Sequence, residues 1–242
     1  MPSPLRRMED QVALVTGGNR GIGLAIAHAL AREGASVIIT GRDEEALRHA
    51  SNEIKRSGGS VVSHVCDIRD EDSVDSLFAD IGRHFPHLDI LINNAGLAQP
   101  SAHVDHLSLD TWRAAIDTNL TGAFLCTRAA LPMLRRGSTI VNNVSIAAKT
   151  VFPGMSAYAA SKAGLLAFTN TLREELRSRG IRVIAFIPGA TDTGIWQQFW
   201  KEAPREKMMS AESVADALVS ALSLPANATV QDLVITPTGG AL

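Results

Sequence analysis

A tyrosine and a lysine that lie four residues apart are the first side chains in this sequence that could do chemistry. Tyr158 and Lys162 lie in an Ala-rich segment that favours a helix, and this spacing places both side chains on one face, one turn apart. A free phenol has a pKa of about 10, and a neighbouring ammonium lowers it. The pair could therefore act as a general acid and base. The same spacing also fits a tyrosine packed beside a solvated lysine.

A serine precedes the pair at a position that could complete a catalytic group. Ser145 lies thirteen positions before Tyr158, at the end of the apolar, strand-like run from Thr139 to Val144. A hydroxyl there could hydrogen-bond the substrate oxygen that Tyr158 protonates. The strand and the helix must be neighbours for these side chains to meet, so the order of the elements matters.

Short apolar runs alternate with helical segments along the whole chain. Strands are expected at residues 11–16, 36–40, 61–66, 89–92, 139–144, 181–187 and 232–235. Helices are expected at residues 21–33, 43–57, 70–85, 108–136, 156–179 and 210–222. Such alternation needs crossover connections, which produce an α/β fold with a doubly wound parallel sheet covered by helices on both faces. With no repeat or Gly/Ser-rich linker, we expect one domain over residues 1–242, with a loose tail over residues 1–8.

The composition excludes several classes of protein. Hydrophobic residues make up 45% and charged residues 20%, which argues against disorder. The net charge of -2 gives no electrostatic footprint for nucleic acid or an anionic membrane. No apolar stretch reaches the roughly 20 residues that span a bilayer. Arg6 and Arg7 are followed by Glu9 and Asp10, where a signal peptide would need its apolar region, so we expect a cytoplasmic protein.

Neither the cysteines nor the histidines indicate a metal site. Cys66 and Cys126 are the only cysteines, too few for a disulfide framework or a Cys-rich metal site, and we expect both to be small buried side chains. His103 and His106 flank Asp105, but no further ligands follow at a supporting spacing. We therefore expect no metal.

A glycine-rich turn separates the first expected strand from the first expected helix. At this point a doubly wound sheet binds the pyrophosphate of a dinucleotide, because glycines let the backbone approach the phosphates and the helix N-terminus offers N–H groups. The spacing Gly-x-x-x-Gly-x-Gly differs from the commoner Gly-x-Gly-x-x-Gly. The residues expected to hold the cofactor here are Gly17, Asn19, Arg20, Gly21, Ile22 and Gly23.

The end of the second strand indicates which dinucleotide binds. An acid there would hydrogen-bond the ribose 2′-OH of NAD, whereas this sequence has Thr40-Gly41-Arg42. Arg42 can pair with the 2′-phosphate of NADP through its fork of donors, and Arg20 could add a second positive charge. Asp43 and Glu44 follow, but an acid at a helix start is stabilised by the helix dipole. We therefore expect NADP(H) as the cofactor, in preference to NAD(H).

Taken together, these residues resemble the classical short-chain dehydrogenase/reductase family over essentially the whole chain. The resemblance is carried by Thr16-Gly17-x-x-x-Gly21-Ile22-Gly23, Asn93-Asn94-Ala95-Gly96, Asn119, Ser145, Tyr158-x-x-x-Lys162, and Pro188-Gly189 with Thr193. It implies a Rossmann-like fold with a seven-stranded parallel sheet. It also implies hydride transfer between a nicotinamide and an alcohol or carbonyl compound.

The resemblance assigns roles to individual residues. Tyr158 would exchange the proton, Lys162 would lower its pKa and hold the nicotinamide ribose, and Ser145 would hold the substrate oxygen. Asn119 would kink its helix and hold a water in a proton relay to Lys162. The remaining implied cofactor contacts are Asp67 and Ile68 at the adenine, Asn94, Ala95 and Gly96 after the fourth strand, and Pro188, Gly189, Thr191 and Thr193 at the nicotinamide end.

Two departures from the family pattern occur, and the second bears on the substrate. Asn142-Asn143-Val144 precedes Ser145 where the family often has Asn-Ile-Ser, and Met208-Met209 stands where a Gly-x-Pro is frequent. The substrate is therefore open between a 3-oxoacyl thioester, as in acyl-carrier-protein reductases, and a smaller or cyclic carbonyl compound. A dinucleotide-binding regulator without turnover is a further alternative, but it would have no chemical need for the four residues Asn119, Ser145, Tyr158 and Lys162.

Two segments could contact a substrate or a partner. Residues 193–209 carry Trp196, Phe199 and Trp200 at a spacing that places them on one helix face, and we expect a mobile lid whose aromatic face covers the substrate. The alternative is that these aromatics only pack on the body of the protein. The helix that starts at Ser156 is small or apolar around most of its circumference over residues 159–168, so one side would need a partner. We expect a homodimer or homotetramer.

Overall fold

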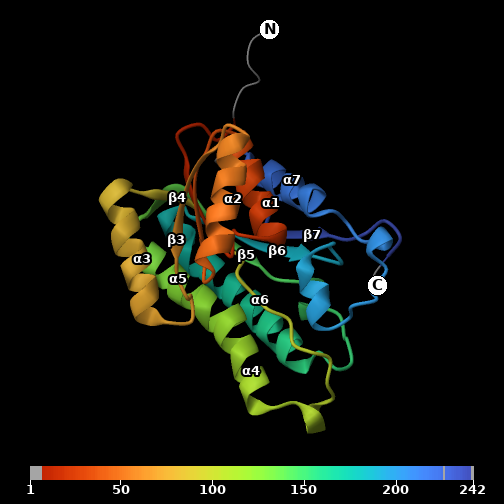
Figure 1. Cartoon of the computed structure of the whole chain (residues 1–242). Coiled ribbons are helices and arrows are strands. Elements are labelled where there is room, and N and C mark those ends of the chain that lie inside the picture. Colours follow the sequence, from red (N-terminus) through yellow and green to blue (C-terminus); the bar gives the residue numbers. More distant parts are fainter. Residues whose placement is uncertain (1–6, 226, 241–242) are drawn as a thin grey trace.

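A seven-stranded sheet forms the centre of the part of the molecule that the structure describes. The computed structural model describes residues 7–225 and 227–240. All strand pairs are parallel, and the strand order is β3-β2-β1-β4-β5-β6-β7 (Figure 1). The strands are β1 Val12–Thr16, β2 Ser36–Gly41, β3 Ser60–Val65, β4 Leu88–Asn93, β5 Leu134–Asn143, β6 Arg182–Pro188 and β7 Asp232–Ile235. The expected doubly wound, Rossmann-like fold is confirmed.

Helices connect consecutive strands by crossing the faces of the sheet. They are α1 Gly21–Arg32, α2 Glu44–Arg56, α3 Glu71–His84, α4 Leu109–Ile116, α5 Gly122–Ala130, α6 Ser156–Leu176 and α7 Ala211–Leu222. Side chains cap the first turn of several of these helices. The Asp43 carboxylate accepts the Ala46 N–H at 2.9 Å, and the Ser108 hydroxyl accepts the Thr111 N–H at 3.1 Å. Such caps satisfy amides that the first helical turn leaves without an intrahelical partner.

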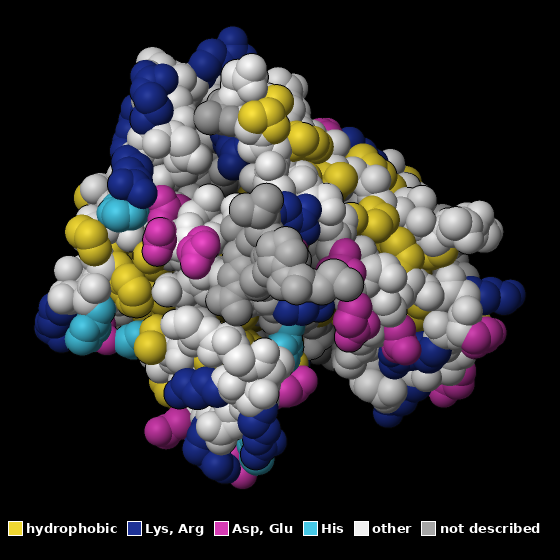
Figure 2. All heavy atoms as spheres, turned by 90° about the horizontal axis from the view of Figure 1, so that it is seen from above, with side chains coloured by type: hydrophobic (Ala, Val, Ile, Leu, Met, Phe, Trp, Pro, Cys, Tyr) yellow, Lys and Arg dark blue, Asp and Glu magenta, His cyan; other side chains and the backbone are white. Residues whose placement is uncertain are grey.

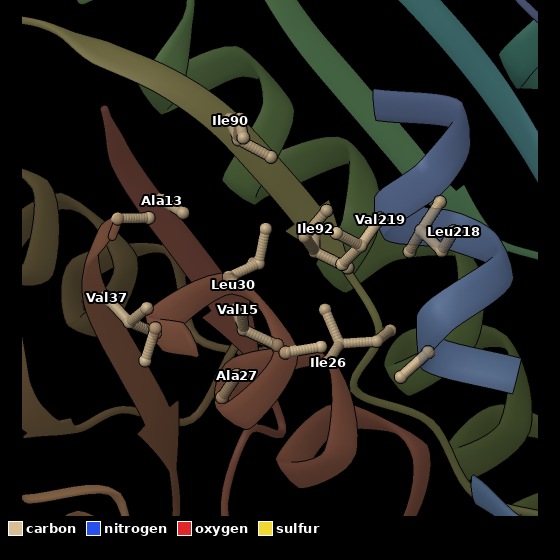
Figure 3. Close-up of a cluster of buried hydrophobic side chains, with 14 of the residues drawn as sticks. Ala13, Val15, Ile26, Ala27, Leu30, Val37, Ile90, Ile92, Leu218 and Val219 are labelled. Atoms are coloured by element: carbon tan, nitrogen blue, oxygen red, sulfur yellow. The ribbon is translucent and has the colours of Figure 1, made fainter. Parts of the chain in front are cut away.

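Two apolar layers bury the faces of the sheet. Helices α1, α2 and α7 pack on one face, where Val15 of β1 and Ile92 of β4 meet Leu30 of α1 and Val219 of α7 (Figure 3). Helices α3, α5 and α6 pack on the other face around side chains such as Leu14. Because both faces are covered, the central strands are apolar in nearly every position rather than alternating.

The long helix expected at residues 108–136 is wrong in two respects. Helix α4 passes into a π-helical turn at Asp117–Thr121 before α5 begins, and α5 ends at Ala130. Strand β5 then starts at Leu134, which pairs with Leu88, earlier than the expected start at residue 139. Pro132 cannot continue a helix. The charged residues Arg135 and Arg136 interrupt the apolar pattern, so the start of the strand could not be recognised from an apolar run.

The loose tail expected over residues 1–8 is wrong for its last two members. Met8 is buried, with 1% of its surface exposed, and packs on the core beside α1. Its N–H donates to the Glu33 carbonyl at 3.0 Å. The Arg7 guanidinium also donates to the Glu33 carboxylate at 2.6 Å. Residues 1–6 lie outside the described part of the chain.

The surface carries charges of both signs. In Figure 2, Asp and Glu side chains lie among Lys and Arg side chains over much of the face that is viewed. Among the described residues, none of the helices combines the length and the apolar character needed to cross a bilayer.

Between β1 and β4 the chain changes the direction in which it adds strands to the sheet, and the functional site lies at this position. The chain winds outward from β1 through β2 to β3, then returns and winds the other way from β4 to β7. Open parallel sheets bind ligands outside the carboxyl ends of their strands at such a point. Apart from Asn119, the motifs singled out in the sequence lie on the loops or helix starts that follow the carboxyl ends of strands, so the fold brings them together at these ends.

Candidate active site

A cavity of about 970 Å³ lies along the carboxyl ends of the strands. It collects residues that follow all seven strands, from the glycine turn after β1 to Thr236 and Pro237 after β7. With the exception of Asn119, every residue singled out from the sequence for catalysis, cofactor or substrate lines this cavity. Its volume suits a large ligand or two smaller ones, since ligand pockets commonly measure about 300–1,000 Å³.

The glycine turn presents a bare helix end to the cavity. Helix α1 begins at Gly21, and Arg20, its N-cap residue, makes no side-chain cap bond to any part of the described chain. The first-turn residues Gly21, Ile22 and Gly23 include no acid. The amides at this positive helix end are therefore available to an anion. The donor set fits the pyrophosphate of a dinucleotide.

Close packing at Gly17 explains why the turn needs glycine. Its φ is +63°, and a Cβ would lie 2.9 Å from the Cα of Ala95. The Asn94 side chain supports the same turn by donating to the carbonyls of Thr16 and Gly17 at 2.9 and 3.2 Å. The Asn-Asn-Ala-Gly segment after β4 therefore holds the glycine turn in shape.

Positive side chains line the cavity at the glycine turn and after β2 and β3. Arg42 and Arg20 are exposed there and line the cavity. Asp43 is committed to capping α2, as expected for an acid at a helix start. Asp67 is held by the guanidinium of Arg69, whose Nε donates at 2.9 Å, and this bond keeps the pKa of the Asp67 carboxyl below its usual value. Arg69 also lines the cavity, and the sequence motifs gave no signal for it.

Ser145, Tyr158 and Lys162 come together at the end of β5 and the start of α6. Burial raises the pKa of the Tyr158 phenol, and a hydrogen bond with Ser145 acts in the opposite direction. The pKa of Lys162, which is 4% exposed, falls to about 8 because burial disfavours its charged form. The lowering of the Tyr158 pKa by Lys162 stays an expectation, and burial of the phenol, which raises that pKa, is the largest influence in the structure.

A chain of hydrogen bonds links the lysine to the glycine turn. The Lys162 Nζ donates to the backbone carbonyl of Asn143 at 2.7 Å. The Asn143 side chain donates to Asn94 Oδ1 at 2.8 Å, and Asn94 holds the turn as described above. Asn143 also lines the cavity. Sequence reasoning missed its role, although the departure from the family pattern at this position was the available signal.

Asn119 lies behind the cavity wall, in the π-helical turn between α4 and α5. The helix is distorted at this residue, as the family resemblance implies. Its side chain is 1% exposed, and both hydrogens of its amide nitrogen are used, one toward the Leu97 carbonyl at 3.0 Å and one toward Ser161 Oγ at 2.9 Å. The side-chain amide of Asn119 is thus part of the framework under the site.

Three aromatic side chains, Trp196, Phe199 and Trp200, also line the cavity. They follow β6 in a short 3-10 helix, Gly194–Gln198, and the residues just after it. The ring of Trp196 lies 4.8 Å from that of Phe199 and 6.1 Å from that of Trp200, so the three rings form one cluster as the spacing predicts. The Trp196 indole donates to the Thr191 carbonyl at 2.8 Å. This bond fixes the cluster to the end of β6.

Further wall residues near Tyr158 were not recognised in the sequence. They are neutral and mostly apolar. They escaped recognition because they come from the loops after β4 and β5, where no motif marks them. They are Leu97, Ala98, Ser101, Ile146, Ala147, Phe152, Pro153 and Met155. The charged residues that line the cavity lie at the glycine turn and after β2 and β3, apart from Lys162.

Comparison with known proteins agrees with this geometry. The family model of the short chain dehydrogenases matches residues 11–204. A protein from Synechocystis named 3-oxoacyl-[acyl-carrier-protein] reductase is 35% identical over 238 residues, which cover 95% of this chain and 96% of that protein.

Solved structures agree in the same way. A short chain dehydrogenase from Burkholderia cenocepacia, solved in complex with NADP, superimposes with a TM-score of 0.86 at 34% identity, covering 95% of this chain and 98% of that one. A variant of an actinorhodin polyketide ketoreductase solved with NADPH gives a TM-score of 0.84 at 31% identity, covering 94% and 96% of the two chains. The chain therefore belongs to the short-chain dehydrogenase family.

Proposed function

We propose that this protein is an NADP(H)-dependent oxidoreductase that interconverts a carbonyl compound and a secondary alcohol, with Tyr158 as the general acid and base. One observation carries the proposal. A single cavity joins Ser145, Tyr158 and Lys162 to a glycine turn whose helix end is open to an anion. A proton donor and a dinucleotide site in one cavity are what a carbonyl reductase needs.

NADP(H) fits the residues that line the cavity at the glycine turn and after β2. The cofactor supplies or accepts the hydride when it is bound. The amides at the start of α1 suit its pyrophosphate, and Arg42 and Arg20 suit a 2′-phosphate because guanidinium groups pair with phosphate oxygens. The carboxylate of Asp43, the acid that follows the end of β2, is already used as the N-cap of α2, where it accepts the Ala46 N–H. The relatives solved with NADP and NADPH support the same choice.

The protein's own groups would handle the proton. Because burial raises its pKa, the Tyr158 phenol stays protonated at neutral pH and can donate to the oxygen of a carbonyl substrate. Ser145 would hydrogen-bond the same oxygen and orient it. Lys162, held by the Asn143 carbonyl, places a positive charge beside the phenol and would favour the phenolate that forms as the proton leaves.

The substrate end of the cavity favours a neutral compound with an apolar body. The aromatic cluster and residues such as Phe152 and Met155 line this end. We propose that residues 193–209 act as a lid over such a substrate. A 3-oxoacyl thioester is the second candidate, favoured by the likeness to the Synechocystis reductase.

We further propose that the enzyme works as a homodimer or homotetramer. Phe124 on α5 and Trp112 on α4 are 43% and 37% exposed, and the neighbouring face of α6 carries the exposed Ala163 and Ala167. Large apolar side chains that are exposed in this way suit contact with a second copy. The cytoplasmic location expected from the N-terminal residues stays a prediction.

The decisive experiment is a spectrophotometric screen of NADPH oxidation. The panel contains simple ketones, cyclic ketones and 3-oxoacyl thioesters, each assayed with NADPH and with NADH. We expect oxidation of NADPH by at least one ketone class. A protein that binds NADPH tightly and turns over no carbonyl compound would instead be the regulator considered above, and the proposed function would be wrong.

A further inference from the structure

Gln99, in the loop after β4, is fully buried, and both ends of its side-chain amide are hydrogen-bonded. Its exposed fraction is 0%. Its Oε1 accepts the backbone N–H of Tyr158 at 2.9 Å, and its Nε2 donates to the Gly154 carbonyl at 3.0 Å. A buried amide is costly unless both of its ends find partners. This one finds both in the segment that opens α6.

The first turn of α6 depends on this contact. The opening amides of a helix need acceptors from outside the helix, yet the N-cap residue Met155 makes no side-chain cap bond to the described chain. Tyr158 is the third residue of α6, the position whose N–H an N-cap side chain commonly accepts. Gln99 therefore caps α6 from another element, at the residue proposed to exchange the proton.

The turn at Gly154 has the backbone conformation that the hydrogen bond from Gln99 requires. Gly154 has a φ of +82°, and a Cβ there would lie 2.5 Å from Ser101 Oγ. This left-handed turn directs the Gly154 carbonyl back to the loop after β4, where it accepts from the Ala102 N–H at 3.0 Å as well as from Gln99. The turn and the loop are thus joined twice.

The other side of the Tyr158 peptide is held as well. The Tyr158 carbonyl accepts from Ser161 Oγ at 2.7 Å, and Ser161 Oγ accepts from Asn119 at 2.9 Å. Asn119 exchanges two hydrogen bonds with the backbone of Leu97, at 2.9 and 3.0 Å. Leu97 and Gln99 belong to the same loop, so these bonds form a closed circuit that starts and ends beside β4.

We propose that Gln99 is a positioning residue that fixes the first turn of α6, and with it the Tyr158 phenol, against the loop after β4. This inference rests on the function proposed above. The contact does not touch the substrate or the reacting atoms. It acts through the backbone of Tyr158, and a displacement of about 1 Å at a reacting group can lower the rate by about 10²-fold.

Gln99→Met is the direct test, because methionine has a similar length and can make neither bond. We expect kcat for an accepted ketone to fall at least about tenfold, while the KM for NADPH changes less than about twofold. The matched control is Ile54→Val, which creates a small defect in the core under α2 and lowers stability without touching α6. A purely structural role of Gln99 would make both variants lose stability and keep kcat.

A second measurement does not depend on activity. Tyr158 is the single tyrosine of the chain, so fluorotyrosine labelling gives a fluorine NMR signal from this ring alone. We expect the signal to shift or split in Gln99→Met and to stay in place in Ile54→Val. If the wild type reduced no carbonyl compound, the proposed function would fail, and the fluorine signal would still decide whether Gln99 positions the ring.

Gln99→Glu keeps the test valid if the methionine variant does not fold. Its carboxyl group retains the acceptor for the Tyr158 N–H but can donate to the Gly154 carbonyl only when protonated. We therefore expect the kcat of this variant, relative to the wild type, to recover as the pH is lowered. An unchanged kcat and an unmoved fluorine signal in either Gln99 variant would overturn the inference.

Discussion

The ammonium nitrogen of Lys162 lies 5.8 Å from the centre of the Tyr158 ring, over its face. At this distance the positive charge is attracted by the ring, while the Asn143 carbonyl anchors the same nitrogen. The two groups are therefore neighbours without a direct hydrogen bond between nitrogen and phenol. The phenol is left free to face Ser145 and a substrate oxygen.

Tyr158→Phe removes one oxygen from this arrangement and keeps the ring. General acid catalysis contributes typically about 10²–10⁴-fold, so we expect turnover to fall by at least about 10²-fold. NADPH affinity, measured by fluorescence titration, should survive. Near-wild-type turnover on an accepted ketone would show that Tyr158 is not the proton donor.

Lys162→Met should make the nucleotide-free protein more stable at neutral pH. A pKa lowered from 10.5 to about 8 corresponds to a cost of roughly 3 kcal/mol for the buried charge, and loss of the bond to the Asn143 carbonyl offsets part of the gain. We expect a net increase of about 1–2 kcal/mol in the free energy of unfolding, measured in urea at pH 7, together with loss of turnover.

The sign of the pH dependence provides the check on this prediction. Between about pH 8 and the unfolded pKa of about 10.4, the unfolded chain binds more protons at Lys162 than the folded one. The wild type should therefore gain stability relative to Lys162→Met as the pH rises through this window. A difference between the two proteins that stays constant from pH 7 to pH 10 would contradict the buried charge.

Arg42→Ala should reduce the affinity for NADPH and barely affect that for NADH. A charge-assisted hydrogen bond to phosphate is worth roughly 1.5–3 kcal/mol, and the exposed position of Arg42 favours the low end, so we expect about a tenfold change in Kd. The control is Arg48→Ala, an exposed arginine of α2 that lies outside the cavity lining. Equal wild-type affinities for the two cofactors would refute the role of Arg42.

Trp196→Ala and Trp200→Ala separate a lid from static packing. If the aromatic cluster covers the substrate, each change should raise KM or lower kcat for the accepted ketone and leave NADPH affinity and Tm nearly unchanged. Trp200 is 42% exposed, so its removal should cost little stability. A loss of several degrees in Tm with unaltered kinetics would instead assign these tryptophans a structural role.

The proposed assembly can be measured directly. We expect light scattering at micromolar concentration to give the mass of a dimer or tetramer, and Phe124→Asp to shift that mass toward a smaller species because it places a charge in the apolar contact. Phe124 packs edge-on to Phe168 with the ring centres 6.3 Å apart, so Tm should be followed as a control. A monomeric wild type would reject the proposal.

The sequence predicted the sheet and the site edge because both depend on local signals. Apolar runs such as Val12 to Val15 identify buried strands, and a glycine turn or an Asn-Asn-Ala-Gly segment marks where each strand ends. The same logic failed at Leu134, where polar neighbours mask a strand that is defined by pairing with Leu88. Local pattern cannot reveal a partner that lies far away in the chain.

The parts of the site that escaped prediction depend on such distant partners. Gln99 belongs to no motif and Asn143 shows only a departure from the family pattern, so their roles emerge when the fold places them against Tyr158 and Lys162. The pKa directions were missed for the same reason, because spacing along a helix reports the neighbour of Tyr158 but not its burial. Motifs identify which residue types are present, whereas the burial that shifts their pKa values depends on the folded structure.

Because the strands are parallel, their amino ends lie opposite the cavity and carry none of the proposed site residues. The turn between α2 and β3 lies at these amino ends, where Ser57 and Gly58 are exposed and a side chain added at Gly58 would meet nothing within 4 Å. Exposed loop tips of this kind accept insertions well. A fluorescent protein or an immobilisation tag inserted there would be held on the far side of the sheet from the cofactor, which makes this turn the natural attachment point for a biosensor or a surface-bound form of the enzyme.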